Sequence, residues 1–423
     1  MKHSTTKQSG ILHLASGIQN MISYNEALKI TQKAFKSLNL QTEEFDLLDS
    51  VGRILGEDIY SDINLPPFDN SAMDGIAIKM NPSIKKWKVI GEIPAGKFSE
   101  FEIDEESAVN IMTGSMLPPG CDTVIPIEDI DADDHQAELK DGVRFVEGMN
   151  VRSQGQDLEK GKIALEKNTR LQSHHIAVAA SCGKTSVQVY KPLKIGILAT
   201  GDELVDIDEK PQVDKIRCSN LYSLLAAVKG MGMEPVNLGI ARDDKKLIYD
   251  RMKNALENKI DILITTGGVS VGKYDYVKEI HEKLGINIQF HGVFIKPGKP
   301  TLFGTYEKNG HTTLVFGLPG NPVSSLVNFI LYIQQNVDEL LGSSDLKRFT
   351  GVLMDDLSKK DGKRHFMRGI YTYNDKNGTF QVRKMGSQSS GNLAEMGKSN
   401  CLIIIEEERR NPRKGEHVEC IMI

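Results

Sequence analysis

The sequence of 423 residues contains no apolar run long enough to cross a membrane as a helix. Its apolar runs, such as Leu402 to Ile405, are far shorter than the roughly 18–20 residues that such a helix needs. Residues 1–20 also lack the apolar stretch of about 7–15 residues that marks a secretory signal. We therefore expect a cytoplasmic protein that has no membrane partner.

Cysteine is rare and scattered, with five residues in the whole chain and no C-x-x-C pair. They are Cys121, Cys182, Cys218, Cys401 and Cys420. This spacing argues against a disulfide framework and against a zinc knuckle. The adjacent His174 and His175 do not make a metal-binding pair either, because neighbouring side chains on a helix point about 100° apart. Reduced thiols fit a cytoplasmic location.

The chain also lacks an excess of positive charge. It has 52 Lys and Arg against 57 Asp and Glu, a formal charge of −5, which argues against a general nucleic-acid partner. Residues 343–423 differ, with 15 Lys and Arg against 11 Asp and Glu. This basic segment could help to collect an anionic ligand, or it could simply be a solvated surface.

The composition is that of an ordinary globular protein, with 39% hydrophobic and 26% charged residues. A first helix is predicted from Ser23, where Ser23 and Glu26 form an S-x-x-E capping box. A second helix is predicted from Ser173 to Cys182. Between them, short β-type runs broken by prolines and glycines indicate a small β module inserted into an elongated helical linker domain.

From Pro192 to about Gly342, strands alternate with helices. We expect strands at 194–200, 235–241, 260–266, near 288–295 and at 313–316, and helices at 220–230, 244–257, 274–284 and from Ser324 or Ser325 to Leu341. Buried apolar strands joined by amphipathic helices predict a doubly wound, mostly parallel α/β domain. The β-type runs after it fit a compact β-barrel or sandwich.

The predicted fold class is therefore a multidomain α/β protein. Its domains would be an elongated linker of residues 21–54 and 149–190, an inserted β module of 55–148, an α/β domain of 191–342 and a C-terminal β-barrel of 343–423.

Ligands of an open parallel sheet bind beyond the carboxyl ends of its strands, because loops and helix N-termini converge there. Five such loops are rich in glycines, carboxylates and lysines: 200–203, 242–244, 267–275, 296–300 and 317–322. We expect these loops to form one rim of mixed charge.

Two glycines of the third loop, Gly267 and Gly268, would let backbone N–H groups approach a phosphate, with Ser270 as a further donor. The alternative is a steric turn before a helix. Lys296 and Lys299 flank a rigid Pro-Gly turn, so both ammonium groups could hold oxyanions. The alternative is that these lysines are merely solvated.

Three carboxylates, Glu203, Asp243 and Asp275, come from different loops, as Mg²⁺ coordination shared with substrate phosphates would require. The alternative role for Asp275 is capping of a helix N-terminus, and the same holds for Asp244, which follows Asp243 in the chain. Taken together, the rim favours metal-assisted attack on, or release of, a phosphate-bearing group.

Two stretches of the predicted β module, Leu65 to Gly75 and Asn110 to Gly114, place polar side chains among turn formers. Ordinary turn chemistry explains either stretch singly. Beside the α/β domain, they could line the other wall of a cleft.

These stretches and loops closely resemble the molybdopterin molybdenumtransferase family, which is similar to the E domain of gephyrin and of its plant counterpart. The resemblance runs from about Ile22 to Ile423. Its motifs are PPFDNSAMDG at 66–75, IMTG at 111–114, ATGDEL at 199–204, TGGVSVG at 266–272, IKPGKP at 295–300, GLPGNPVS at 317–324 and RG at 368–369.

The resemblance implies a homodimer whose active sites form near the α/β domain and are completed by other domains, including the partner's inserted β module. It implies binding of adenylylated molybdopterin and molybdate, Mg²⁺-assisted release of AMP, and insertion of molybdenum into the dithiolene. Transient contact with other molybdenum cofactor enzymes is a further possible partner interaction.

Residue by residue, the resemblance places Lys296, Lys299, Pro300, Arg368 and Ser390 around molybdate, with Ser389 as an alternative to Ser390. Asp243 and Asp275 would serve Mg²⁺ and the phosphates, with Glu203 nearby. Gly267, Gly268, Ser270 and Asn321 are expected to bind substrate, and Asp74, Thr113 and Asp157 match functional positions on other walls.

Two residues depart from the family pattern. Cys218 stands where Asp or Asn is usual, and Gln156 replaces the usual Glu. Two other functions remain open from the residues: a related nucleotide-binding enzyme that consumes ATP or hydrolyses a nucleotide pyrophosphate, and a gephyrin-like scaffold without turnover.

Overall fold

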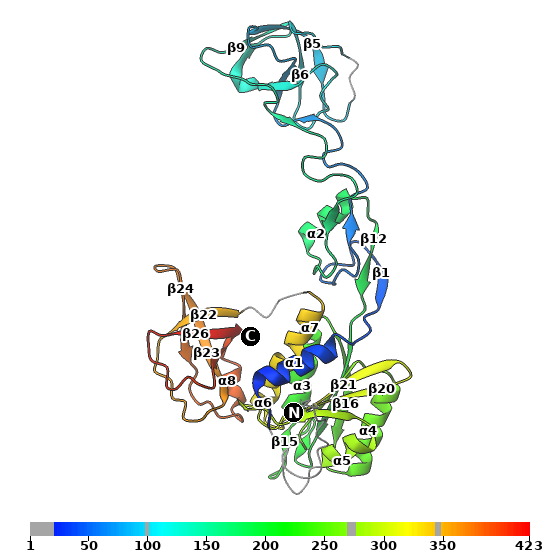
Figure 1. Ribbon diagram of the computed structural model, residues 1–423, viewed down its shortest axis with the longest axis vertical. Helices are drawn as coiled ribbons and strands as arrows, with labels where there is room; N and C mark the ends of the chain where they lie inside the picture. Colours follow the sequence, from blue (N-terminus) through cyan, green and yellow to red (C-terminus); the bar gives the residue numbers. More distant parts are fainter. Residues whose placement is uncertain (1–20, 98–100, 269–275, 343–347) are drawn as a thin grey trace, which may run out of the picture. The chain divides into compact units, whose positions relative to one another are not determined.

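The computed structural model describes residues 21–97, 101–268, 276–342 and 348–423, without the side chains of 276–278 (Figure 1). Contacts group these residues into two compact units. One unit contains the described parts of 1–41 and 191–423, and the other contains those of 42–190. Within the described ranges, no helix is both long and apolar enough to cross a membrane.

The first unit is built on a six-stranded sheet in the order β16-β13-β17-β21-β20-β18. Its strands are β13 (Lys194–Thr200), β16 (Glu234–Ala241), β17 (Ile262–Thr266), β18 (Asn287–His291), β20 (Leu302–Lys308) and β21 (His311–Leu318). The four strands from β16 to β21 pair in parallel, whereas β20 and β18 pair antiparallel. The predicted mostly parallel sheet is confirmed, but β20 was not predicted.

Helices cover both faces of this sheet, with α3 and α6 on one face and α4 and α5 on the other (Figure 1). The helices are α1 (Tyr24–Phe35), α3 (Ser219–Gly230), α4 (Lys245–Glu257), α5 (Tyr276–Lys283), α6 (Pro322–Phe329) and α7 (Gln335–Leu340), with a π-helical segment, η2 (Ile330–Gln334), between the last two. Burial on both faces explains why β13 and β17 are nearly continuous apolar runs. The doubly wound fold is thus confirmed.

The expected closing helix begins earlier than predicted. Pro322 is its first residue and Asn321 its N-cap, because proline suits the first helical position, where no N–H donor is needed. The helix is also interrupted by η2 before α7. Of the helix expected at 274–284, the structure describes Tyr276–Lys283.

The C-terminal strands of this unit close into a barrel. They are β22 (Arg348–Leu353), β23 (Arg364–Asn374), β24 (Thr379–Lys384), β25 (Cys401–Ile405) and β26 (His417–Met422), and α8 (Leu393–Met396) lies between β24 and β25. The order β23-β24-β22-β26-β25 is closed by pairing of β25 with β23, which settles the prediction in favour of a barrel. A short strand of the α/β region, β19 (Ile295–Lys296), pairs in parallel with β23.

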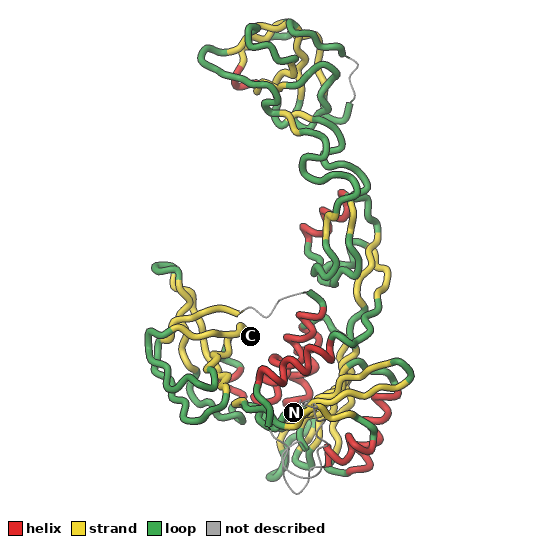
Figure 2. The backbone as a smooth tube through the Cα atoms, in the orientation of Figure 1, coloured by secondary structure: helices red, strands yellow, loops and turns green. Residues whose placement is uncertain are grey.

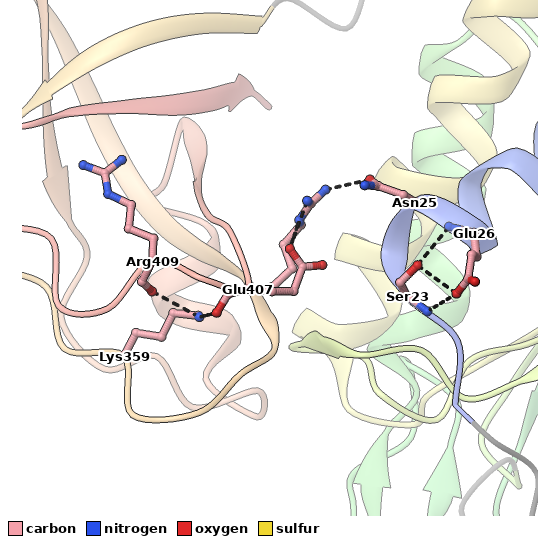
Figure 3. Close-up of polar contacts among 7 residues, drawn as sticks. Ser23, Asn25, Glu26, Lys359, Glu407 and Arg409 are labelled. Atoms are coloured by element: carbon pink, nitrogen blue, oxygen red, sulfur yellow. Dashed lines mark hydrogen bonds and ion pairs between the residues drawn. The ribbon is translucent and has the colours of Figure 1, made fainter.

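The first helix, α1, belongs to this unit. Its Gln32 side chain donates to Glu339 at 2.8 Å, and Thr31 accepts from Asn336 at 3.1 Å. At its start, Ser23 and Glu26 form the predicted capping box (Figure 3). The contacts of α1 are therefore with the α/β region, whereas the sequence led us to expect a linker helix. The four-domain division stays a prediction.

The second unit is mostly strands and loops (Figure 2). Its main sheet has the order β7-β4-β6-β5-β9-β8, made of β4 (Gly75–Ile78), β5 (Lys86–Ile93), β6 (Ser107–Ile111), β7 (Thr123–Pro126), β8 (Ile130–Ala132) and β9 (Gln136–Leu139). The other elements are β1 (Thr42–Asp46), β2 (Ile59–Tyr60), β3 (Asn70–Ser71), η1 (Ile127–Asp129), β10 (Val151–Arg152), β11 (Ile163–Leu165), α2 (Ser173–Ser181) and β12 (Ser186–Tyr190).

Candidate active site

The carboxyl ends of the central parallel strands are tied together by backbone hydrogen bonds. The Gly201 N–H donates to the Ala241 carbonyl at 3.1 Å, and the Gly267 N–H donates to the Leu318 carbonyl, also at 3.1 Å. These bonds link β13 to β16 and β17 to β21 where their loops begin. The predicted rim is therefore a connected structure.

A cavity of about 810 Å³ lies at this rim, and we call it the carboxylate cavity. Its lining includes Glu203, Asp243, Gly267, Gly268, Asn220, Cys218, Pro300, Pro319 and Asn321. The structure thus brings together six predicted site residues from loops far apart in the sequence: Glu203, Asp243, Gly267, Gly268, Pro300 and Asn321. The predicted Ser270 and Asp275 lie outside the described residues.

The Gly267 position accepts only glycine without rearrangement. Its φ of 92° falls in the left-handed region. A Cβ atom there would lie 2.4 Å from the Thr200 carbonyl oxygen. The close approach of two strand ends, rather than a generic turn, therefore requires this glycine.

The two neighbouring aspartates of the second loop have different surroundings. Asp243 is exposed in the cavity, and its N–H donates to Asp202 Oδ1 at 3.1 Å. Asp244 instead caps α4, because its Oδ1 accepts from the Leu247 N–H at 2.7 Å. The capping interpretation therefore holds for Asp244, whereas Asp243 lines the cavity.

The donor set of the carboxylate cavity fits Mg²⁺. Among the described residues, no three His, Cys, Asp or Glu side chains are placed to hold a metal ion. Mg²⁺, however, usually binds one or two carboxylates together with substrate phosphates and water. Glu203 and Asp243 supply two exposed hard-oxygen donors, as such a shared site requires.

A second cavity, of about 720 Å³, lies next to the first and shares Pro300, Pro319 and Asn321 with it. We call it the lysine cavity. Its lining includes Lys296, Lys299, Lys363, Lys384, Ser324, Ser358, His365, Gln388, Ser389 and Ser390. None of the described residues that line it is Asp or Glu. The cavity is therefore suited to an anion.

The α/β region and the barrel build the lysine cavity together. Lys296 of β19 lies opposite His365 of β23 in a parallel pair. On the turn that follows, Gly298 has a φ of 100°, and a Cβ there would lie 2.3 Å from the buried Asn328 amide. This turn positions Lys296, Lys299 and Pro300 on one wall of the cavity.

Arg368 lies behind the cavity wall, because its side chain is only 1% exposed. Its guanidinium donates to the carbonyls of Ser387 at 2.6 Å, Ser389 at 3.0 Å and Asn392 at 2.6 Å. Burial lowers the pKa of Arg368. The loop that it holds is also bonded to α6, since the Ser390 carbonyl accepts from the Val323 N–H at 3.2 Å.

His365 is a buried polar group of the lysine cavity. Its Nε2 lies 2.7 Å from Asp361 Oδ1. Burial lowers the pKa of His365, and the Asp361 carboxylate opposes this effect. Lys296 adds to the lowering. A neutral imidazole at this position leaves the lysines as the cations of the cavity.

Figure 3 shows how the barrel is joined to α1. Lys359 donates to the carbonyls of Glu407 at 2.8 Å and Arg409 at 3.2 Å. The Glu407 carboxylate accepts from Arg364 Nε at 3.0 Å, and Arg364 Nη1 donates to Asn25 Oδ1 at 3.0 Å. This chain of bonds fixes the start of β23 beside the α/β region.

The remaining predicted residues lie in the second unit. Thr113 donates to Asp74 Oδ1 through its N–H at 2.6 Å and through its hydroxyl at 2.8 Å. These hydrogen bonds lower the pKa of Asp74. Asp157 forms an ion pair with Arg152. Asp74 and Thr113 are therefore brought together, whereas the ion-pair partner of Asp157 is Arg152.

Both departures from the family pattern have local partners. Cys218 precedes α3 and lines the carboxylate cavity, and burial raises the pKa of its thiol. Gln156 accepts from the Ser153 N–H at 3.1 Å through its side-chain oxygen. Glu203 and Asp243 still line the carboxylate cavity, and four lysines line the lysine cavity.

Sequence reasoning missed several residues of the lysine cavity: Ser358, Lys363, His365, Lys384 and Gln388. They come from the barrel, where no strand-end rule applies. The basic charge of the last segment and the RG motif at 368–369 pointed to this side, but to none of these five residues.

Three family models together match most of the chain. The MoeA N-terminal region (domains I and II) matches residues 22–183, the probable molybdopterin binding domain matches 196–339, and the MoeA C-terminal region (domain IV) matches 350–423. The molybdopterin molybdenumtransferase of Haemophilus influenzae is 37% identical over 388 residues, covering 89% of this chain and 93% of that protein. The chain belongs to the molybdopterin molybdenumtransferase family.

Other members of the family are similarly close. The molybdopterin molybdenumtransferase of Bacillus subtilis is 32% identical over 394 residues, 90% of each chain. A crystal structure of the molybdopterin biosynthesis MoeA protein from Pyrococcus horikoshii OT3 is 29% identical, with a TM-score of 0.80 over 96% of this chain and all of that one. The chain is therefore an enzyme, a transferase of molybdenum cofactor biosynthesis.

Proposed function

We propose that this enzyme inserts molybdenum from molybdate into adenylylated molybdopterin and releases AMP in a Mg²⁺-dependent step. One observation carries the proposal: a cavity lined by lysines adjoins a cavity lined by carboxylates and glycines, and they share Pro300, Pro319 and Asn321. A dianion and a phosphate-bound metal ion need such neighbouring but opposite environments.

In this proposal, the lysine cavity binds molybdate. Lys296 and Lys299 supply the positive charge from the rigid turn, Pro300 shapes the wall, and Ser390 supplies polar contacts, with Ser389 as its neighbour. Arg368 acts through the loop that carries these serines, because three carbonyls occupy its guanidinium. Fixed donors of this kind bind an oxyanion without reorganisation.

The carboxylate cavity binds the adenylate and pyrophosphate part of the substrate. Glu203 and Asp243 would hold Mg²⁺, with Asp275 as a third ligand, and the ion would neutralise phosphate charge when bound. Gly267 and Gly268 allow backbone N–H groups to approach the phosphates, and Ser270 and Asn321 add polar contacts. The shared wall then brings the dithiolene sulfurs to the molybdate site.

Further parts of the proposal rest on the resemblance to the family. The enzyme would act in the cytoplasm as a homodimer, and Asp74, Thr113 and Asp157 of the partner subunit would complete each active site. It would also make transient contact with other enzymes of molybdenum cofactor biosynthesis. The depressed pKa of Asp74 supports a carboxylate role, since the group stays ionised at neutral pH.

A single assay tests the reaction. Purified enzyme is given adenylylated molybdopterin, molybdate and Mg²⁺, and AMP release and active cofactor are measured together. We expect both products, dependence on molybdate and Mg²⁺, and no consumption of ATP. Consumption of ATP would indicate the related nucleotide-binding enzyme, and folded protein that releases no AMP would contradict the proposal.

A further inference from the structure

The barrel wall of the lysine cavity carries two lysines that the proposed function does not use. Lys363 precedes β23, and Lys384 is the last residue of β24. Lys296 and Lys299 lie on the opposing α/β wall. Four lysines from two structural regions therefore line the cavity, and none of its described lining residues is a carboxylate.

Their positions follow from the strand pairing. Lys384 lies opposite Gly369 in the antiparallel pair of β23 and β24. The Lys363 N–H donates to Asp361 Oδ1 at 3.1 Å, which fixes its backbone. Lys384 is exposed and Lys363 is partly exposed. Among the described residues, neither ammonium group makes an ion pair within 4.0 Å, so both charges remain available to a ligand.

Two other basic side chains of the barrel offer no free cationic donor to this wall. Arg368 is buried and its guanidinium is bonded to three carbonyls. Burial lowers the pKa of His365, which favours its neutral form. The cationic donors that the barrel places in the cavity lining are therefore Lys363 and Lys384.

We propose that Lys363 and Lys384 set the affinity and charge selectivity of the oxyanion site, favouring a tetrahedral dianion over a monoanion of the same shape. This inference rests on the proposed function only in taking molybdate as the dianion. Coulomb energy is proportional to the charge of the ligand, so each lysine stabilises a dianion about twice as much as a monoanion at the same place. None of the described residues that line the cavity is a carboxylate, and the nearby Asp361 carboxylate is hydrogen-bonded to His365.

The test measures binding of molybdate and of perrhenate, its tetrahedral monoanionic counterpart, to the full chain at low ionic strength. The variants are Lys363→Gln, Lys384→Gln and the double variant. Each single substitution should weaken molybdate binding about threefold to tenfold, and salt should reduce the difference. Perrhenate binding should weaken by about the square root of the same factor.

Two variants serve as controls. Lys376→Gln removes an exposed lysine from the turn at the other end of the β23–β24 hairpin and should leave both affinities unchanged. Lys363→Arg keeps the charge and should retain most of the molybdate affinity. Thermal unfolding shows whether each variant is folded. Because Lys384 is exposed, Lys384→Gln is the variant expected to disturb the fold least.

The outcomes are distinct. Unchanged molybdate affinity in the folded double variant would overturn the inference, as would equal losses for molybdate and perrhenate. Folded wild-type enzyme that binds no molybdate would overturn it together with the oxyanion part of the proposed function. Wild-type enzyme that binds molybdate but releases no AMP would contradict only the proposed reaction.

Discussion

Asn328 donates a hydrogen bond of 2.6 Å to the Thr301 hydroxyl, beneath the turn that carries the two lysines of the α/β wall. The hydroxyl in turn donates to the Gly298 carbonyl at 2.7 Å. Both side chains are fully buried, and neither lines a cavity. The position of Lys296 and Lys299 thus depends on a polar network inside the protein.

Replacing Thr301 by valine should weaken molybdate binding, because it removes the hydroxyl while keeping the shape of the side chain. Asn328 would then retain only its longer bond of 3.2 Å to Gly298. The free energy of unfolding should fall by about 1–3 kcal/mol, the usual cost of a buried polar group that loses its partner. Molybdate titration and urea unfolding measure the two effects.

The matched control is Thr313→Val, which removes another fully buried hydroxyl that donates to Ile260 at 2.7 Å. We expect a similar loss of stability and no change in molybdate affinity. Thr301→Ser should restore binding. If Thr301→Val and Thr313→Val weaken molybdate binding equally, the network has no special role in the site.

The neighbours Asp243 and Asp244 provide a second test, because they differ in surroundings but not in chemistry. Asp243→Asn should reduce Mg²⁺-dependent AMP release at least tenfold and leave stability unchanged, since the side chain is exposed in the cavity. Asp244→Ala should cost about 1 kcal/mol of stability through loss of the α4 cap and retain turnover. AMP release and urea unfolding of both variants are compared, and the reverse pattern would remove Asp243 from the site.

Much of the fold could be predicted because local pattern and tertiary structure agree. Fully buried parallel strands need continuous apolar runs, and β13 and β17 have them. The missed strand β20 joins β21 through Asn309-Gly310, both at positive φ. This pair is a strong hairpin signal that the sequence did carry. The strand β20 could therefore have been predicted from the sequence.

The α/β half of the site was predictable for a similar reason. Loops at the carboxyl ends of neighbouring parallel strands lie at one edge of the sheet. This rule alone predicts that Glu203, Asp243 and Gly267 lie close together. No such rule exists for the barrel, where the position of Lys363 and Lys384 depends on closure by distant strands. The burial of Arg368 was hidden for the same reason, because a motif fixes a residue's place in the chain but not the direction of its side chain.

Arg368 gives a third prediction. Because its guanidinium is bonded to three carbonyls, Arg368→Ala should lower the free energy of unfolding by at least about 2 kcal/mol and increase hydrogen exchange of residues 387–392. Molybdate binding should weaken in parallel. Arg368→Lys keeps the charge but not the planar set of donors, so it should restore little of the protection.

Hydrogen exchange separates the two roles open to Arg368. If exchange of 387–392 stays at the wild-type level in folded Arg368→Ala while molybdate affinity is lost, the arginine contacts the anion directly. Loss of protection together with loss of affinity places its effect in the loop that carries Ser389 and Ser390.

Asp74 and Thr113 lead to a prediction on pH. The Thr113 hydrogen bonds lower the pKa of Asp74 from its ordinary value of 3.8. A carboxylate with a depressed pKa stabilises the folded state above that ordinary value, and this contribution is lost as the pH falls through the folded-state pKa. Thr113→Val removes one of the two donors. Its stability deficit should therefore be complete at about pH 7 and shrink below about pH 4.

The measurement can use Trp87, the single tryptophan of the chain, which is buried in β5. The same sheet contains β6, which ends at Ile111, two residues before Thr113. Urea unfolding followed by Trp87 fluorescence reports on this sheet at each pH. Thr113→Ser keeps the hydroxyl and should behave as the wild type. A deficit of Thr113→Val that grew on acidification would show that the hydroxyl does not act through the ionised Asp74, because protonation of the carboxyl removes the group that the hydroxyl stabilises.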